Sequence, residues 1–130
     1  MMQLKDQFEQ VYQVTEQIYV GFLNSYGDNN PLHTNAELAR SKGFRDRVMH
    51  GAIQAGFLSH FIGEALPEKD VIVHTYELHF RNPVYLGDRL TLRAVIADYS
   101  ESVRCFEIKF RFYNEAGTEV SRGKVSIGLI

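Results

Sequence analysis

Residues 51–65 constrain the fold of this chain more than any other segment, because they are apolar on nearly every side of a helix. The run reads Gly-Ala-Ile-Gln-Ala-Gly-Phe-Leu-Ser-His-Phe-Ile-Gly-Glu-Ala, and Leu66-Pro67 ends it. A helix on a protein surface needs a polar face, and this one has none. The rest of the chain must therefore provide elements that cover it.

The second half of the chain provides strands, because from residue 71 onward the hydrophobic period becomes two. The alternation and the turn residues between the runs predict long strands near residues 71–81, 89–98, 102–113 and 118–129. Turns are expected at Asn82-Pro83, Gly87-Asp88, Tyr99-Ser100 and residues 114–117. With a first strand at 7–14, the pattern indicates a meander-like antiparallel sheet.

The first half is mainly helical, which makes the fold class α+β. Thr15 has the position of an N-cap for a helix that runs to about Asn24. Asn35 is expected to cap a short helix at 36–41, and Gly43 follows where left-handed backbone often ends a helix.

Composition indicates one globular domain over residues 1–130, since 45% hydrophobic residues suffice for one core and the length leaves no room for a second. The interspersed charges, with a net charge of -2, argue against nucleic-acid and membrane partners. A single cysteine, no signal-peptide pattern and no long apolar run predict a cytoplasmic protein.

A sheet with one apolar face and a helix that is apolar all round fit together when the sheet curves around the helix. This is the hot-dog arrangement. One sheet covers only part of such a helix, so we expect a second copy to cover the rest in a symmetric homodimer.

Residues 27–33, Gly-Asp-Asn-Asn-Pro-Leu-His, hold a carboxylate and an imidazole on one short segment. Because Asn30-Pro31 disfavours helix at residue 30 and the neighbouring residues favour turns, we expect the segment to be irregular. Taken alone, Asp28 is most simply a turn residue and His33 a partly buried histidine. Together they have the composition of a pair that shares one water molecule.

The complete motif Gly27-Asp28-x-Asn30-Pro31-Leu32-His33 resembles the signature of the MaoC-like, (R)-specific enoyl-CoA hydratases. Two further segments resemble the same family: Val48-Met49-His50-Gly51-Ala52 before the apolar helix, and Phe80-x-x-Pro83-Val84-x-x-Gly87-Asp88-x-Leu90, which we take as a hairpin at the second strand. Together they cover most of the chain.

The resemblance implies reversible addition of water to a trans-2-enoyl thioester, which gives a (3R)-hydroxyacyl product. It implies that Asp28 and His33 activate the water and that the backbone N–H of Gly51 stabilises charge on the thioester oxygen. A serine eight positions after the glycine, here Ser59, is expected to bond to the aspartate, although back-bonding within its own helix is an equal alternative. Asn30 is a supporting residue that orients the site or simply fixes the turn.

Substrate-binding candidates follow from position. His50 and Ala52 flank Gly51, and His50 is expected to shape the start of the helix more than to exchange protons. Arg45 and Arg47 belong to a local basic cluster that has the right charge for the phosphates of coenzyme A or of a carrier-protein phosphopantetheine arm, with solvated surface as the alternative.

No cofactor is expected, since coenzyme A or phosphopantetheine would be part of the substrate. No metal is predicted either, because the three remaining histidines have no ligand-like spacing with Cys or acidic residues: His60, His74 and His79.

Two alternative functions share the fold. A hot-dog acyl-CoA thioesterase generally directs hydrolysis with a carboxylate on the central helix, where Glu64 is the only acid within 51–65 and lies at the far end. A non-catalytic acyl-thioester-binding module would not need both Asp28 and His33.

Overall fold

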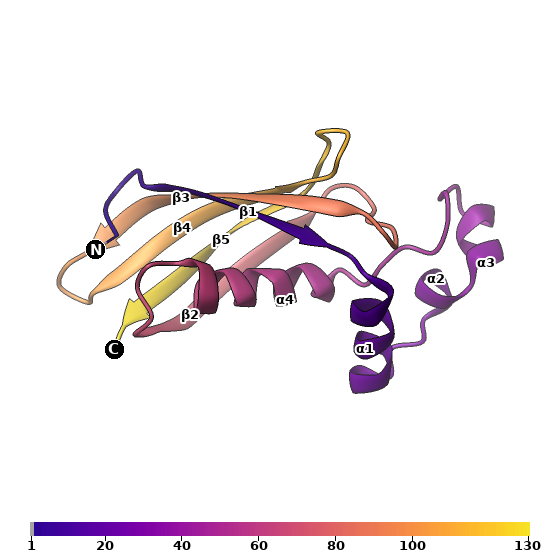
Figure 1. Ribbon diagram of the computed structural model, residues 1–130, viewed down its shortest axis with the longest axis horizontal. Helices are drawn as coiled ribbons and strands as arrows, with labels where there is room; N and C mark the ends of the chain where they lie inside the picture. The colour runs from indigo at the N-terminus through magenta and orange to yellow at the C-terminus, as the bar shows by residue number, and fades with distance from the viewer. Residues whose placement is uncertain (1) are drawn as a thin grey trace.

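The computed structural model describes residues 2–130 and has the expected α+β architecture, in which one curved sheet lies against one long helix (Figure 1). In chain order, the elements are β1 Gln7–Gln13, α1 Glu16–Tyr26, α2 Pro31–Thr34, α3 Ala36–Ser41, α4 Ala52–His60, the π-helical turn η1 Phe61–Ala65, β2 Val71–Phe80, β3 Arg89–Ser100, β4 Cys105–Tyr113 and β5 Glu119–Leu129. No helix in this described range combines the length and the apolar character needed to cross a bilayer.

The sheet is antiparallel and has five strands in the order β1-β3-β4-β5-β2. The predicted meander is therefore right only for β3, β4 and β5. β2 pairs with β5 at the far edge, and the segment 81–88 crosses from there to β3 instead of forming the expected hairpin. Alternation along a strand predicts its faces but says nothing about its neighbours, which is why the sequence missed this crossing.

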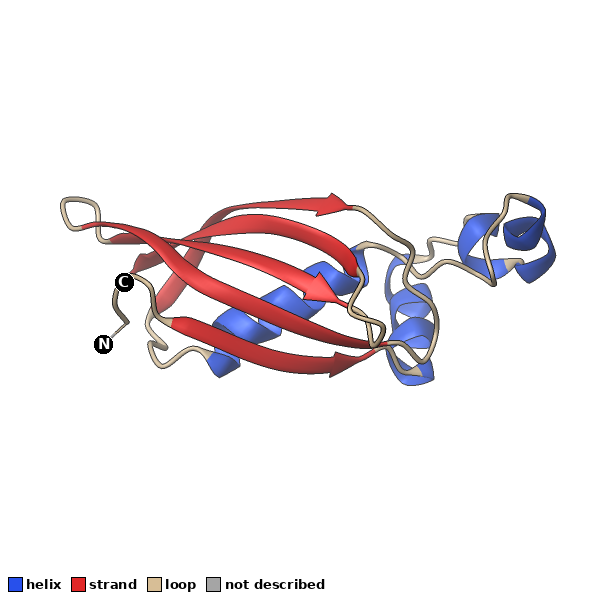
Figure 2. Cartoon of the chain, turned by 90° about the horizontal axis from the view of Figure 1, so that it is seen from above, coloured by secondary structure: helices blue, strands red, loops and turns tan. Residues whose placement is uncertain are grey.

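The helix α4 lies across the concave face of the sheet, as both views show (Figures 1 and 2). Its inward residues Ile53, Phe57 and Leu58 are buried, and Phe57 stacks on Tyr12 of β1 with ring centroids 4.7 Å apart. Each large apolar side chain buried in this way contributes about 1.5–3 kcal/mol. The opposite side of α4, with Gly56 among its residues, is exposed in the single chain.

Two local predictions at the end of the apolar helix need correction. The segment 51–65 is not α-helical throughout, because its last turn, η1, is a π-helix in which the Leu66 N–H donates to the Phe61 carbonyl at 3.2 Å. This wider turn keeps Phe61 and Ile62 both buried. The turn after the third strand lies at residues 101–104, since β3 continues through the predicted Tyr99-Ser100 turn.

The strand β2 differs most from its predicted half-buried character. Tyr76 and Phe80 are 56% and 54% exposed, although they lie on the inner face of the sheet opposite Val125 and Ser121. Ile72, 50% exposed, lies on the outer face instead, because an irregularity between Val73 and Thr75 shifts the alternation. β2 is an edge strand, and the single chain leaves its inner face largely uncovered. By contrast, the central strands β3 and β4 alternate between buried and more exposed positions as predicted.

The three short helices gather at the end of the sheet where α4 begins (Figure 1). The predicted caps are confirmed: the Thr15 side chain accepts from the Ile18 N–H, and the Asn35 side chain accepts from the Leu38 N–H. Gly43 follows α3 with a positive φ of 93°. The fold thus places the 27–33 segment beside the first turn of α4.

Candidate active site

The segment that carries Asp28 begins where α1 ends. Gly27 closes α1 in the left-handed conformation, with φ 66°, and its N–H donates to the Leu23 carbonyl at 2.8 Å. A side chain other than glycine is disfavoured at that φ, so the turn that aims Asp28 depends on this residue. The Asn30 N–H then donates to Asp28 Oδ1 at 3.2 Å, which forms a local Asx turn.

The expectation that residues 27–33 are irregular is wrong for the second half of the segment. Residues 31–34 form the short helix α2, with Pro31 in its first position and the Asn30 side chain accepting from the Leu32 N–H at 2.9 Å. Proline suits the first turn of a helix because its fixed φ is helical and the missing N–H would be unpaired there anyway. Asn30 therefore acts on the site as a helix cap, the simpler of its two predicted roles.

His33 is held in one tautomer by the backbone. Its Nδ1 lies 2.7 Å from the carbonyl oxygen of Val48, and a carbonyl oxygen accepts but cannot donate. Nδ1 must therefore carry the proton in the neutral ring, which leaves a lone pair on Nε2. The Tyr19 hydroxyl also donates to the His33 carbonyl at 2.6 Å, so the main chain of this residue is fixed as well.

The side chains of Asp28 and His33 converge. With His50 they form a group in which one carboxylate oxygen and one ring nitrogen from each histidine all lie within 4.8 Å of one another. Asp28 is exposed, His33 is half-buried and His50 is buried. A carboxylate and an unprotonated imidazole nitrogen at this separation can hold one water molecule between them and accept its proton.

Gly51 stands beside this group at the start of α4. It lines a cavity of about 370 Å³ together with His33, Gln54, Phe80 and Arg81. Within residues 2–130 no side chain caps the start of α4, so no side chain competes with a ligand for the N–H groups that begin the helix. A Cβ on Gly51 would lie 2.6 Å from Cζ of Phe80, so only glycine fits with the aromatic ring in its present position.

Two predicted residues lie away from this cavity in the single chain. Ser59 is exposed on α4, eight residues beyond Gly51, which is about 12 Å along a helix. Within residues 2–130 no hydrogen bond joins it to Asp28, so one chain does not form the contact that the resemblance implies. Ala52 is exposed in the first turn of α4 and does not line the cavity.

The two arginines lie near the candidate site but do not line its cavity. The Arg45 guanidinium stacks 4.2 Å from the ring centroid of Tyr85 and lies 3.7 Å from Asp88. Arg47 lies 5.2 Å from the ring centroid of Tyr19, on α1. Both guanidinium groups are therefore placed by aromatic rings at the end of the sheet where α4 begins.

A profile of the MaoC like domain family matches residues 2–119 of the chain. The chain belongs to the MaoC-like dehydratase family.

Relatives of this MaoC-like domain include named hydratases and dehydratases. It is 34% identical over 79 residues to a 3-hydroxybutyryl-CoA dehydratase of Methylorubrum extorquens, a match that covers 61% of the chain and 50% of the relative. It is 36% identical over 69 residues to an (R)-specific enoyl-CoA hydratase of Rhodospirillum rubrum, with 53% of the chain and 48% of the relative covered. The chain thus spans about half the length of these two relatives.

Solved structures confirm the hot-dog fold of the MaoC-like domain. The unliganded R-hydratase PhaJ1 from Pseudomonas aeruginosa superposes with a TM-score of 0.88 at 26% identity, covering 98% of this chain and 82% of that chain. The (R)-hydratase of Aeromonas caviae superposes with a TM-score of 0.90 at 22% identity, covering 99% and 98%.

The sequence indicated no site role for several residues that line the cavity of the MaoC-like domain, among them Gln54, Phe80 and Arg81. Gln54 is buried and accepts a hydrogen bond from the buried Ser121 hydroxyl of β5, a contact across 67 residues that no local pattern could reveal. Phe80 was predicted only as part of the strand near residues 71–81 and of the hairpin pattern that follows it. Its alternation gave the correct face, but not its place over Gly51.

The residues that converge at the site also form the only group within residues 2–130 with enough ligand atoms for a metal ion: Asp28, His33 and His50. The two imidazole rings face each other, with centroids 4.0 Å apart and an interplanar angle of 33°. The absence of a metal remains a prediction.

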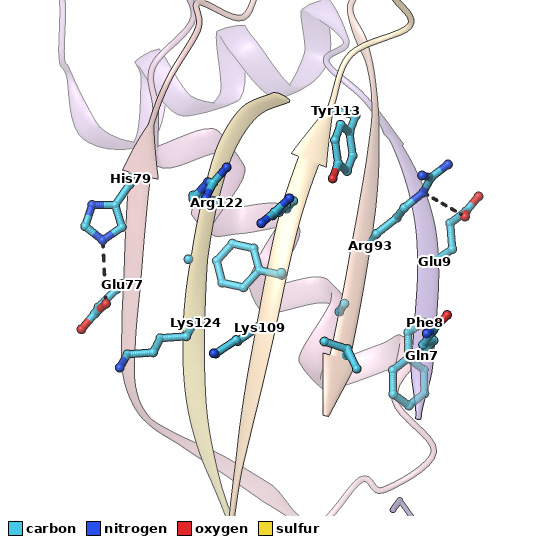
Figure 3. Close-up of a pocket in the computed structure, with 15 residues that line it drawn as sticks. Gln7, Phe8, Glu9, Glu77, His79, Arg93, Lys109, Tyr113, Arg122 and Lys124 are labelled. Atoms are coloured by element: carbon cyan, nitrogen blue, oxygen red, sulfur yellow. Dashed lines mark ion pairs between the residues drawn. The ribbon is translucent and has the colours of Figure 1, made fainter. Parts of the chain in front are cut away.

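A larger cavity, of about 750 Å³, lies on the outer face of the sheet, away from α4 (Figure 3). Two pairs form within its lining: Arg93 lies 3.3 Å from Glu9 on β1, and His79 lies 3.7 Å from Glu77 on β2. Arg122, which also lines it, donates two hydrogen bonds to Glu119 and thereby lowers the pKa of that carboxyl group. None of the predicted catalytic residues lines this cavity.

Proposed function

We propose that this MaoC-like domain is a hydro-lyase that adds water reversibly across the double bond of a trans-2-enoyl thioester to give a (3R)-hydroxyacyl thioester. The observation that carries the proposal is the backbone-fixed His33, whose imidazole forms a group with the Asp28 carboxylate beside the Gly51 cavity and whose Nε2 the Val48 carbonyl leaves free to accept a proton. The names of the relatives, an (R)-specific enoyl-CoA hydratase and a 3-hydroxybutyryl-CoA dehydratase, support the same reaction class.

In the proposed mechanism, a water molecule lies between the Asp28 carboxylate and His33 Nε2. As its oxygen attacks C3 of the substrate, the pair accepts one proton from the water. Electron density from the double bond moves onto the thioester oxygen, where the Gly51 N–H and the start of α4 stabilise the developing negative charge. The enolate then collapses and C2 takes the proton from the same pair.

This path predicts syn addition, because the water and the returned proton come from the same face of the substrate. It also predicts reversibility, since the same pair can remove the C2 proton and protonate the leaving hydroxyl. No cofactor takes part in the path, and the thioester carrier, coenzyme A or a phosphopantetheine arm, is part of the substrate. Arg45 and Arg47 are proposed to contact its phosphates.

The geometry supports a thioesterase activity less well than it supports a hydratase activity. Glu64, the only acid of the central helical segment, is exposed in η1 at the end of that segment opposite Gly51. A carboxylate there is too far from the thioester position to direct water at the carbonyl carbon.

The proposed active form is a homodimer. The inner face of the edge strand β2 exposes three apolar side chains of the kind that a second copy would cover: Val73, Tyr76 and Phe80. The exposed side of α4 would be covered by the same association. Since Ser59 lies on that side, its contact with an Asp28 is proposed to form across the two copies and not within one.

One assay separates the candidate functions. Purified protein is mixed with crotonyl-CoA, and the enoyl absorbance and the free thiol are followed together. The proposal expects loss of the enoyl band without thiol release. Thiol release would instead indicate a thioesterase, and no change with short-chain, medium-chain and carrier-bound enoyl thioesters would indicate a binding module. The variant His79→Gln, on the outer face of the sheet, serves as the control and should behave as wild type.

A further inference from the structure

His50 is buried beside Asp28 and His33, and the proposed mechanism gives it no role. It is only 3% exposed, and its Nδ1 is the one buried side-chain nitrogen or oxygen without a hydrogen-bond partner within the described residues 2–130. Its other ring nitrogen, Nε2, lies 2.8 Å from the backbone carbonyl oxygen of Asp28. Because that oxygen only accepts, Nε2 carries the proton and donates it.

We propose that His50 is a positioning residue of the active site, which holds the backbone of Asp28 with its Nε2–H and packs the face of its ring against His33. The inference rests on the proposed function, in which Asp28 and His33 act as one unit. It assigns His50 no contact with the reacting atoms.

The Asp28 segment depends on this bond because its other hydrogen bonds are local. Residues 27–30 are exposed, and their other hydrogen bonds all join residues between 23 and 34. Within residues 2–130, the bond from His50 is the only hydrogen bond that ties these four residues to a distant part of the chain, 22 positions away from Asp28. Without it, no hydrogen bond from outside the segment would hold Asp28 in place.

The same ring also restricts His33. The two imidazole centroids lie 4.0 Å apart, and Phe22 packs on His50 with a centroid distance of 4.5 Å. His33 is thus held at Nδ1 by Val48 and on one face by His50, which leaves Nε2 little freedom to turn away from the water position. A catalytic nitrogen misplaced by about 1 Å costs on the order of 100-fold in rate.

The unpartnered Nδ1 is consistent with a functional constraint on this ring. A buried polar atom without a partner is unfavourable, and an apolar side chain would fill the same space without that cost. Phenylalanine would keep the packing on His33 and Phe22 but would lose the Nε2–H donor. Only a residue with a donor at that position can hold the Asp28 carbonyl.

Two variants separate positioning from packing. His50→Phe keeps an aromatic face and loses the donor, whereas His50→Gln keeps a donor and loses the ring. We expect His50→Phe to lower kcat about 100-fold with KM within about threefold, and His50→Gln to recover at least about tenfold of that loss. The melting temperature of each variant is measured as well. If His50 had a purely structural role, kcat of the two variants would fall in proportion to the loss in melting temperature, whichever group was kept.

A second measurement tests the inference without activity. Long-range ¹H–¹⁵N correlation spectra of the wild-type imidazoles should show the Nε2–H tautomer for His50 and the Nδ1–H tautomer for His33. The opposite tautomer at His50, or wild-type turnover in His50→Phe, would overturn the inference. If wild-type protein hydrates no enoyl thioester but shows both tautomers, the proposed function fails while the tether to Asp28 stands.

Discussion

The outer-face cavity and the Gly51 cavity differ in volume, in charge and in how their polar side chains are held in place. The outer-face cavity is about 750 Å³ and is lined by charged side chains, some of which form exposed ion pairs, such as Arg93 with Glu9 and His79 with Glu77. The smaller cavity, about 370 Å³, has few charged groups, but the histidine in it is oriented by a backbone carbonyl. Backbone contacts fix a tautomer and a direction, whereas exposed ion pairs contribute little and move easily. The orientation of its polar groups, and not its volume or charge, therefore distinguishes the smaller cavity as the proposed reactive site.

The strongest test of this comparison removes the proposed water-activating pair. Asp28→Asn and His33→Ala should each lower kcat about 100- to 10,000-fold while the melting temperature stays close to wild type, because both residues are proposed to act on one water molecule. The double variant should be little slower than the slower single variant, because either substitution alone already disables the proposed pair. Rates are measured as loss of the crotonyl-CoA enoyl band.

The matched control for His33 is His79→Gln, which changes a histidine on the outer face that is paired with Glu77. Normal turnover in Asp28→Asn or in His33→Ala would remove that residue from the mechanism. A large loss in His79→Gln would show that the comparison of the two faces is wrong.

The second prediction concerns the oxyanion position. Gly51→Ala places a methyl group in the space of the Phe80 ring, which must move into the cavity that the thioester needs. We expect kcat/KM to fall about tenfold or more, as the substrate oxygen is kept from the start of α4. Gly21→Ala is the control, because a Cβ there meets no atom within 4 Å and should be tolerated. Equal activity of the two variants would contradict the assignment of Gly51.

The third prediction compares the two faces of the edge strand β2. Tyr76→Lys puts a charge on the inner face and should weaken the proposed dimer about tenfold or more in sedimentation experiments. Glu77→Lys changes the neighbouring side chain on the outer face and should leave the dimer unchanged. A wild-type protein that sediments mainly as a monomer at micromolar concentration would defeat the dimer proposal.

The fourth prediction compares two basic pairs. Arg45→Glu with Arg47→Glu should raise KM for crotonyl-CoA about three- to tenfold and leave kcat unchanged, because exposed contacts to phosphate are individually weak. Lys109→Glu with Lys124→Glu makes the same charge change on the outer face and should leave KM unchanged. If the arginine variant keeps the wild-type KM, these residues are solvated surface, the alternative already indicated by the sequence.

The smallest effect is expected at high pH. Burial raises the pKa of Tyr12 from 10.0 to about 12. Between these values the unfolded chain loses the phenolic proton while the folded chain keeps it, so Tyr12 makes stability fall as pH rises above about 10. Absorbance titration of tyrosinate should show a late step that Tyr12→Phe removes. A titration that is complete near pH 10 in both proteins would contradict the buried position.

The sequence predicted elements whose determinants are local. The Thr15 and Asn35 caps, the apolar helix and the alternation of β3 and β4 depend on neighbouring side chains, and the structure confirms them. It missed the pairing of β2 with β5, because strand order is decided by contacts between residues far apart in the chain.

The candidate site was predictable to the same extent. The motif placed Asp28 and His33 on one segment, and they do converge. The carbonyls that orient the two histidines, those of Val48 and Asp28, carry no sequence signal because every residue has one. The predicted hydrogen bond between Ser59 and Asp28 does not form within a single chain. The resemblance does not say whether the two residues belong to the same copy or to two copies.

The stereochemistry of hydration in D₂O tests the central claim most directly, because it reports whether one group on one face both activates water and returns the proton. Crotonyl-CoA is converted in D₂O, and the product is analysed for configuration at C3 and for the position of deuterium at C2. The account predicts a (3R)-hydroxy product with hydroxyl and deuterium added syn, and without free thiol. A (3S) product, anti addition or thiol release would contradict it.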